Sequence, residues 1–254
     1  GSRGKEGAAG LTALAVLRSG AGLCTLAFPE SCQKAVHPME VMTVPLPETA
    51  NGTLSLKAKE LILEHLKDKS AMAIGPGLTT DPETVALVGE LLPLIKCPLV
   101  IDADALNAIS THKNWLDILN PETVLTPHPK EMSRLMGLAT QKIQKNRIAT
   151  ASQFAADHSL TLVLKGSPSL IAMADGTVII NPTGNAGMAT GGSGDVLTGI
   201  IAGLMAQGLP QASIAGSYIH GQAGDYFAKN ESETTLIAGD LLRSLPETLK
   251  RILP

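Results

Sequence analysis

The chain has 254 residues, of which 44% are hydrophobic, 17% are charged and only 2% are aromatic, and its formal net charge is −3. This composition is typical of a well-packed globular protein with an aliphatic core, and so few aromatic side chains argue against a stacking platform for single-stranded nucleic acid. The 20 basic residues form no dense cluster, so we expect neither nucleic acid nor a membrane surface as a partner.

The cysteines and histidines indicate neither a disulfide framework nor a zinc site. Cys24, Cys32 and Cys97 form no CxxC pair, and the six histidines follow no metal-binding spacing. No apolar run reaches the length of a membrane span, and there is no signal peptide. We therefore expect a reduced, cytoplasmic protein.

The first ten residues, GSRGKEGAAG, are typical of a glycine-rich turn that opens a helix, because apolar residues continue at helical spacing from Leu11. Alternatively, Gly1 and Ser2 are the remnant of an expression tag. If the turn is native, a strand should precede it, so we expect a first strand upstream of residue 1. The domain would then come from a longer polypeptide.

Short apolar runs then alternate with segments of helical periodicity, the signature of a parallel sheet with helices on both faces. The runs are AMAIGPGL (71–78), CPLVIDADAL (97–106), ETVLTPHP (122–129) and LTLVLKGSP (160–168), and the helical segments cover 56–66, 82–95 and 143–158. We predict a single doubly wound domain over residues 1–254, a three-layer α/β/α fold with a mostly parallel central sheet.

After the fourth run the pattern changes. Asp175 and Gly176 separate two β-prone runs, which predicts a type I′ hairpin and hence antiparallel strands at one edge of the sheet. The last quarter is predicted to be helical over 195–207, 211–229 and 238–252.

Polar or glycine-rich stretches follow every apolar run. They are Gly75 to Gly77, Asp102 and Asp104, His128, Lys165 and Ser167, and the glycine-rich stretch 184–194. Ligands of open α/β sheets bind beyond the carboxyl ends of the strands, so these stretches should surround one crevice.

The stretch GGSGDVLTG places glycines directly before a helix that we expect to begin between Ser193 and Asp195. Such a loop offers unpaired N–H groups and the positive end of the helix dipole, which suit phosphate without any basic side chain. Asp195 could simply be a first-turn carboxylate that favours the dipole. As a catalytic base it should have a lowered pKa and be reliably ionised at pH 7.

Five stretches together resemble a known family. They are GSRGKEGAAG, AIGPGL, DADALN, LTPHPKEMSRLMG and NAGMATGGSGDVLTGIIAGLMAQG, similar in sequence and order to the ADP/ATP-dependent NAD(P)H-hydrate dehydratases, a branch of the ribokinase-like superfamily. The resemblance runs from residue 1 to about residue 243. It implies a ribokinase-like fold and a repair reaction, in which the S-epimer of hydrated NADH or NADPH is dehydrated while ADP or ATP is split.

The resemblance also implies release of AMP or ADP together with phosphate, a requirement for Mg²⁺, and a homo-oligomer, by analogy a tetramer. ADP is the expected nucleotide, as in bacterial members. The absent first strand is compatible with fusion to an N-terminal epimerase domain.

Carried over by position, the resemblance gives each motif a role. Asp195 deprotonates the hydroxyl of the hydrate, and Gly192 and Gly194 hold the transferred phosphoryl group. The nucleotide binds Lys165, Gly166, Ser167, Pro168, Ser169 and Asn185, and the family more usually has Thr where this chain has Ser169. The substrate contacts Ala8, Gly77 and His128 in addition to Asp195.

Structural alternatives stay open for most of these residues. Lys165 could be a solvated lysine at a strand end, although its isolation from other charges favours a phosphate contact. His128 could be a local hydrogen-bonding residue, with Glu131 as the anchor of the turn or of the helix start. Asn185 could shape its loop, and Ala8 and Gly77 could serve packing.

No direct metal ligand is expected. Asp102 and Asp104 could hold Mg²⁺ through water, or they could cap the helix that follows.

Two other functions compete. A ribokinase-like kinase of a sugar, a hydroxymethylpyrimidine or a thiazole alcohol would use the same phosphate loop. However, thiazole kinases typically carry Cys at the position of Asp195, and sugar kinases lack the HPxE motif at 128–131. A non-catalytic nucleotide-sensing domain is the second rival, and the intact Asp195 argues against it.

Overall fold

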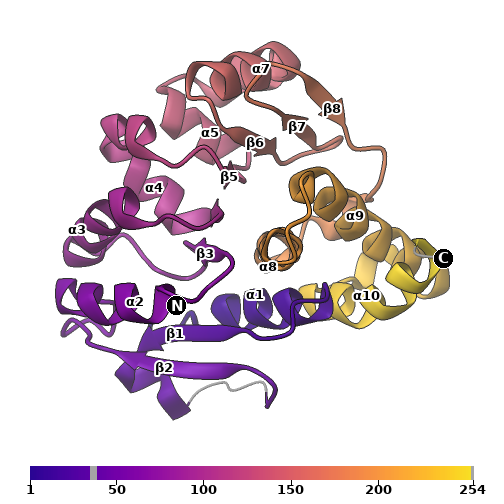
Figure 1. Ribbon diagram of the computed structural model, residues 1–254. Coiled ribbons are helices and arrows are strands. Elements are labelled where there is room, and N and C mark those ends of the chain that lie inside the picture. Colours follow the sequence, from indigo (N-terminus) through magenta and orange to yellow (C-terminus); the bar gives the residue numbers. More distant parts are fainter. Residues whose placement is uncertain (35–38, 253–254) are drawn as a thin grey trace.

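A six-stranded sheet forms the centre of the computed structural model, which describes residues 1–34 and 39–252 (Figure 1). Its strands, in spatial order, are β3 (Met72–Ile74), β4 (Leu99–Ile101), β5 (Thr123–Leu125), β6 (Thr161–Leu164), β7 (Leu170–Ala172) and β8 (Val178–Ile180). Strands β3 to β6 are parallel, and β7 and β8 continue the sheet as antiparallel strands. The four apolar runs and the edge hairpin are therefore confirmed.

Helices that connect the parallel strands cover one face of this sheet. They are α2 (Lys59–Leu66), α3 (Pro82–Leu91), α4 (Ala103–Thr111), α5 (Pro129–Met136), α6 (Thr140–Lys145) and α7 (Arg147–Asp157), with short 3₁₀ turns at Leu56–Ala58, Leu92–Leu94 and Lys113–Ile118. Side chains of a strand alternate between faces. In β4, Leu99 and Ile101 pack against this helical layer, whereas Val100 packs against the opposite one.

The other face is covered by the first helix and the last three. They are α1 (Glu6–Arg18), α8 (Ser193–Ala206), α9 (Ala212–Asn230) and α10 (Ala238–Ile252), with 3₁₀ turns at Ala186–Met188 and Glu233–Thr235. Leu197 and Ile201 of α8 pack against Val100 of β4. Figure 1 shows α8 between the sheet and the other helices of this layer, so the predicted three layers are present.

The order of the strands differs from the doubly wound prediction. Within the six-stranded sheet the order follows the chain without reversal, so the crossover helices α3 to α7 all lie on one face. The helices of the second face therefore come from the two ends of the chain.

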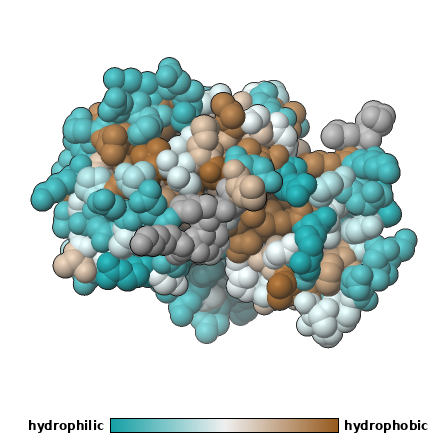
Figure 2. Space-filling view, turned by 90° about the horizontal axis from the view of Figure 1, so that it is seen from below, coloured by the Kyte–Doolittle hydropathy of each residue, from teal (hydrophilic) through white to brown (hydrophobic). Residues whose placement is uncertain are grey.

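A second, two-stranded parallel sheet was missed by the sequence analysis. It pairs β1 (Thr25–Pro29) with β2 (Met42–Leu46), and a 3₁₀ turn at Glu30–Lys34 follows β1. These strands carry prolines and no long apolar run, so their sequence lacks the signal of a buried strand. Figure 2 looks onto this side of the molecule and shows apolar side chains gathered near its middle, with polar surface around them.

Two local predictions were wrong. The hairpin turn is not type I′, because the N–H of Met173 bonds the carbonyl of Thr177 across a three-residue loop and Gly176 has a positive φ whereas Asp175 does not. The helix predicted over 143–158 is interrupted at Asn146, which separates α6 from α7.

No helix in the described residues is both long and apolar enough to span a membrane.

The packing of α1 against α8 requires a glycine. A Cβ at Gly199 would overlap the carbonyl oxygen of Thr12 and lie 2.6 Å from the Cβ of Ala15. The two helices thus approach backbone to backbone. The hydroxyl of Thr12 also donates to the carbonyl of Asp195 at 3.1 Å, so α1 fixes the first turn of α8.

We expect Gly199→Ala to lower the free energy of unfolding by about 1 to 3 kcal/mol, because the added methyl group forces α1 away from α8. Urea denaturation measures this. The matched control is Gly7→Ala in α1, where a Cβ would have no atom within 4 Å. It should stabilise by about 0.5 to 1 kcal/mol through helix propensity. Equal effects of the two substitutions would contradict the close packing.

Candidate active site

The carboxyl ends of four parallel strands meet at one edge of the sheet. β3 leads into Gly75, β4 into Asp102, β5 into the loop of His128, and β6 into Lys165. Neighbouring parallel strands end side by side, so these groups lie close to one another. The first turn of α8 lies against the same edge, as its contacts with Asp102 and Lys165 establish.

A buried ion pair lies at the centre of this edge. The Nζ of Lys165 lies 2.7 Å from Oδ1 of Asp102, whose side chain is only 1% exposed. Oδ2 of the same carboxylate accepts a 2.8 Å hydrogen bond from the hydroxyl of Thr198 in α8. Thr198 is fully buried. Asp102 thus joins strands β4 and β6 to α8, and the prediction that Lys165 stands apart from other charges was wrong.

Lys165 is held as a cation. Burial by itself lowers its pKa, but the negative charges of Asp102 and Glu131 outweigh burial and shift the pKa upward. The carboxylate of Glu131 is 3.9 Å from the ammonium group. A positive charge therefore persists in a site from which water is largely removed.

This ammonium group lies directly beside the start of α8. A Cβ at Gly194 would be 3.2 Å from Nζ of Lys165, so a larger residue there would press on the ion pair. The helix begins at Ser193 as predicted, after Gly192 in the left-handed conformation (φ 88°), and no side chain caps it. Within the described residues the amides of Gly191, Gly192, Gly194 and Asp195 have no hydrogen-bond acceptor from the chain.

Asp195 has a raised pKa, contrary to the sequence prediction. Burial raises the pKa of its carboxyl to about 6, with further increases from Asp102, Asp104 and Glu131, and the cation of Lys165 offsets part of the shift. The prediction of a lowered pKa considered only the helix dipole and missed the carboxylates that the fold gathers nearby. A carboxylate with a pKa near 6 is a stronger base than an ordinary aspartate, yet it is mostly ionised at pH 7.

His128 is the N-cap of α5. Its Nδ1 accepts from the amides of Lys130 and Glu131 at 3.1 and 3.0 Å, and Glu131 accepts from the amide of His128 at 2.8 Å. Because Nδ1 accepts, the ring proton lies on Nε2, on a side chain that is 45% exposed. The local hydrogen-bonding role is present, and Glu131 anchors the helix start as predicted. The other ring nitrogen, Nε2, lies 3.4 Å from the second carboxylate oxygen of Glu131.

The predicted substrate residues Ala8 and Gly77 lie together. A Cβ at Gly77 would be 3.3 Å from the Cβ of Ala8 and 2.7 Å from the carbonyl of Lys5. Ala8 is partly exposed whereas Ala9 is buried, so Ala8 is the better candidate for contact with a ligand. The close contact between Gly77 and Ala8 also means that packing alone explains why both residues are small.

Asp104 links the start of α4 to Lys5 and Thr79, whereas the side chain of Asp102 does not cap α4. The carboxylate of Asp104 accepts from the amide of Thr79 at 2.8 Å and from Lys5 at 3.3 Å. Asp102 is the N-cap residue of α4, but its side chain makes no capping hydrogen bond, so the capping alternative was wrong for it. Within the described residues no group of three or more His, Cys, Asp or Glu side chains is arranged to hold a metal.

The predicted nucleotide loop, residues 165–169, is a closed turn at the surface. The hydroxyl of Ser169 donates to the carbonyl of Gly166 at 3.1 Å and accepts from the amide of Gly166 at 3.3 Å. Ser167 and Pro168 are exposed and joined by a cis peptide bond. Arg147, which sequence analysis did not single out, donates to the carbonyl of Leu164 at 3.2 Å and supports this turn.

Asn185 shapes its own loop. Its Nδ2 donates to Asp225 at 3.0 Å, and its Oδ1 accepts from the amide of Gly187 at 3.1 Å. Asp225 in α9 also accepts from the amide of Gly184 at 2.9 Å. Both polar groups of Asn185 are thus engaged within the chain, which favours the loop-shaping alternative over direct contact with a nucleotide.

Two further residues fix the start of α8, and the sequence offered little signal for either. Thr198 is one turn after Asp195, on the same side of the helix, but it stands within an apolar run. His220 of α9 lies 2.9 Å from the carbonyl of Ser193 through Nε2. Burial lowers the pKa of His220 to about 4, so the ring is neutral at pH 7 and donates this bond.

The family described as NAD(P)H-hydrate dehydratase matches residues 1–247. The chain belongs to the NAD(P)H-hydrate dehydratase family. It is 50% identical over 256 residues to the bifunctional NAD(P)H-hydrate repair enzyme Nnr of Moorella thermoacetica, covering 99% of this chain and 48% of the relative.

Other members of the NAD(P)H-hydrate dehydratase family match over more of their length. The ADP-dependent (S)-NAD(P)H-hydrate dehydratase of Neisseria meningitidis is 36% identical, with 95% of this chain and 80% of the relative covered. The crystal structure of the ADP/ATP-dependent enzyme from Bacillus subtilis, co-crystallised with ATP and Mg²⁺, superposes with a TM-score of 0.82 at 31% identity, covering 99% of this chain and 89% of that one. This confirms the predicted fold class. The chain spans about half the length of the bifunctional relatives it matches.

We expect Asp195→Asn to stabilise the protein at neutral pH and to leave it unchanged in acid. The folded-state pKa of about 6 lies above the ordinary 3.8, so the contribution of this carboxyl to stability is fully present below pH 4 and is lost as pH rises through 6. Asparagine removes that loss, which amounts to at most about 3 kcal/mol at pH 7.5.

Urea denaturation at pH 4 and pH 7.5 measures the difference. The control is Asp175→Asn at the hairpin turn, whose carboxyl pKa is lowered by the amide of Thr177. There the sign should reverse, with any loss of stability found at pH 7.5. A destabilising Asp195→Asn at pH 7.5 would contradict the buried carboxylate.

Proposed function

We propose that this chain catalyses the ADP-dependent dehydration of the S-epimer of hydrated NADH or NADPH, which regenerates the reduced nicotinamide cofactor. The observation that carries this proposal is the position of Asp195 in the first turn of α8, beside free backbone amides and the Lys165 ammonium group. Hydrogen-bond donors for the phosphoryl oxygens and a base for a hydroxyl are thereby placed within one helical turn.

The first step transfers a phosphoryl group. Asp195 accepts the proton of the ring hydroxyl as that oxygen attacks the terminal phosphorus of ADP, and the bond to AMP breaks. The amides of Gly192 and Gly194 stabilise the negative charge that spreads over the phosphoryl oxygens, and Lys165 adds a fixed positive charge beside Gly194. Because these donors are already oriented, little reorganisation is needed during the transfer.

The second step removes the group that was added. The carbon–oxygen bond breaks with phosphate as the leaving group, and a proton leaves the neighbouring carbon to restore the ring double bond. Phosphate departs far more readily than hydroxide. The partly exposed ring of His128 and the close-packed pair Ala8 and Gly77 would border the nicotinamide ring. Ser167 and Pro168 would form the exposed turn for the nucleotide.

Mg²⁺ would accompany the phosphates of the nucleotide. Asp104 suits water-mediated contact better than Asp102, because the side chain of Asp104 is 19% exposed whereas that of Asp102 is 1% exposed. We further propose a cytoplasmic location, a homotetramer, and an epimerase domain in the same polypeptide, as the bifunctional relatives suggest.

The direct test is recovery of absorbance at 340 nm from NADH hydrate with ADP or ATP and Mg²⁺. We expect the native chain to regenerate NADH and Asp195→Asn to lose at least about a thousandfold in rate, since it removes the base. The rate of the native chain should fall about tenfold per pH unit below pH 6, as Asp195 becomes protonated. Phosphorylation of a small alcohol without regeneration of NADH would favour the kinase instead.

A matched pair of glycine substitutions tests the phosphate site. Gly194→Ala places a methyl group 3.2 Å from the Lys165 ammonium group, and we expect it to lower kcat/KM for ADP at least about tenfold. Gly191→Ala places its methyl group in open space and keeps the amide, so its kcat/KM should stay within about twofold of native. Equal losses would show that Lys165 and Gly194 do not act together.

A further inference from the structure

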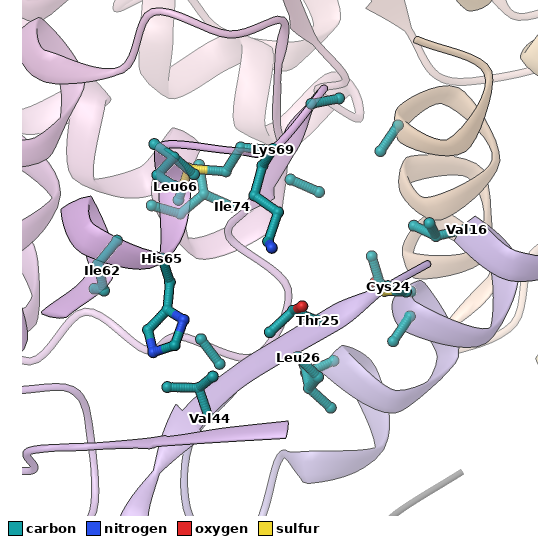
Figure 3. A pocket seen from close by; sticks show the side chains of 18 of the residues that line it. Val16, Cys24, Thr25, Leu26, Val44, Ile62, His65, Leu66, Lys69 and Ile74 are labelled. Carbon is teal, nitrogen blue, oxygen red and sulfur yellow. The ribbon is translucent and has the colours of Figure 1, made fainter. Parts of the chain in front are cut away.

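The two edges of the six-stranded sheet differ in their surroundings. The outer edge of β3 faces a cavity of about 540 Å³, with Val16 of α1, Leu26 of β1 and Ile62 of α2 among the residues that line it (Figure 3). At the opposite end of the sheet, β8 pairs only with β7 among the described residues (Figure 1). The outer edge of β8 is thus open to the surface, and an open edge is a template for another strand.

Two residues of β8 direct their backbone groups away from the sheet. Successive residues of an antiparallel strand point their N–H and C=O groups alternately to one side and to the other. The carbonyl of Thr177 and the amide of Asn181 form hydrogen bonds on the β7 side, at 2.8 and 2.9 Å, so Ile179 between them also bonds toward β7. The N–H and C=O groups of Val178 and Ile180 therefore face outward.

The side chains of this edge do not protect it against pairing. Proteins usually protect an open edge with charged side chains, a bulge or a covering segment. The three residues of β8 are all apolar, and Ile180 is 52% exposed. Pro182 lacks an N–H group, but it comes after the strand and limits only the length of a further ladder.

A second exposed isoleucine lies beside the same edge. Arg147 at the start of α7 donates to the last carbonyl of β6, whereas Ser152 donates to the carbonyl of Gly176 at the amino end of β8. Because β6 and β8 are both antiparallel to β7, they point the same way, and α7 runs in the opposite direction. Ile148, one helical turn before Ser152 and 53% exposed, therefore lies toward the carboxyl end of β8, where Ile180 is.

The two ends of this edge carry opposite charges. Asp175 is exposed in the hairpin turn at the amino end of β8. Lys145 is exposed just before α7, which begins near the carboxyl end of β8. A twofold axis through the middle of β8 would bring Asp175 of each copy to the end where Lys145 of the other copy lies. The edge is therefore complementary to itself in charge as well as in backbone groups.

We propose that the outer edge of β8 pairs with β8 of a second copy of this chain, around a twofold axis at Ile179. Val178 of each copy would exchange both backbone hydrogen bonds with Ile180 of the other. The two six-stranded sheets would then form one continuous sheet. An interface of this kind uses the same surface on both copies, so it closes as a dimer and leaves neither edge open.

This inference rests on the homotetramer proposed above only in that both require self-association, and it is independent of the catalytic reaction. Sedimentation velocity over a range of concentrations tests it. We expect the native chain to self-associate and Ile180→Lys to weaken the association at least about tenfold, because pairing would remove the lysine charge from water. The matched control is Ile118→Lys, an exposed isoleucine before β5, which should change the association by less than about twofold.

Two outcomes would overturn the proposal. A native chain that stays monomeric would exclude both the β8 interface and the homotetramer. A homotetramer that Ile180→Lys leaves intact would exclude the β8 interface alone. Neither outcome depends on whether the protein regenerates NADH.

A cross-link tests the position of the axis. Residues that face each other in a pair without hydrogen bonds have Cβ atoms about 4.5 to 5.5 Å apart, close enough for a disulfide once the strands adjust. We expect Ile179→Cys to give a disulfide-linked dimer on mild oxidation, seen by non-reducing electrophoresis. Thr177→Cys is the control, because two copies of residue 177 would lie about 13 Å apart.

The native chain, with its three free cysteines, gives the background for this experiment. A band above that background for Ile179→Cys alone supports the proposed axis. Equal cross-linking of the two variants, or none above background for Ile179→Cys, would overturn the proposal.

Discussion

The site depends on one buried contact, the carboxylate of Asp102 between the Lys165 ammonium group and the Thr198 hydroxyl. Asp102 follows β4, Lys165 follows β6, and Thr198 belongs to α8, so three elements distant in sequence meet at a single side chain. Removing one partner would leave a buried charge without compensation, which is why such contacts impose a definite arrangement. The start of α8 is fixed against the sheet edge as a result.

The electrostatics of the site follow from this arrangement. The carboxylates of Asp102, Asp104 and Glu131 all act on Asp195, and the cation of Lys165 offsets only part of the rise in its pKa. Burial is the largest cause of the rise in the pKa of Asp195 to about 6, and the neighbouring carboxylates add to it. Burial and the excess of acidic groups near Lys165 thereby produce a base suited to neutral pH.

Local patterns predicted much of the fold and of the site. The apolar runs gave the parallel strands, and GGSGD predicted the start of α8 correctly, because both depend on short-range rules. Local patterns did not predict the contacts between segments that are distant in the sequence. Nothing near Lys165 in the sequence indicates Asp102, and Thr198 is one hydroxyl within an apolar run, so neither the ion pair nor the raised pKa of Asp195 could be predicted.

A carbon-13 NMR titration of the Asp195 carboxyl carbon, assigned by its loss in an Asp195→Asn sample, tests the central arrangement most directly. The account predicts a titration midpoint of about 6 in the native protein and a still higher midpoint in Lys165→Met, because the lysine cation lowers the pKa of this carboxyl. A midpoint near the ordinary 3.8 that does not respond to Lys165→Met would place Asp195 in water, apart from the cluster, and would contradict the account.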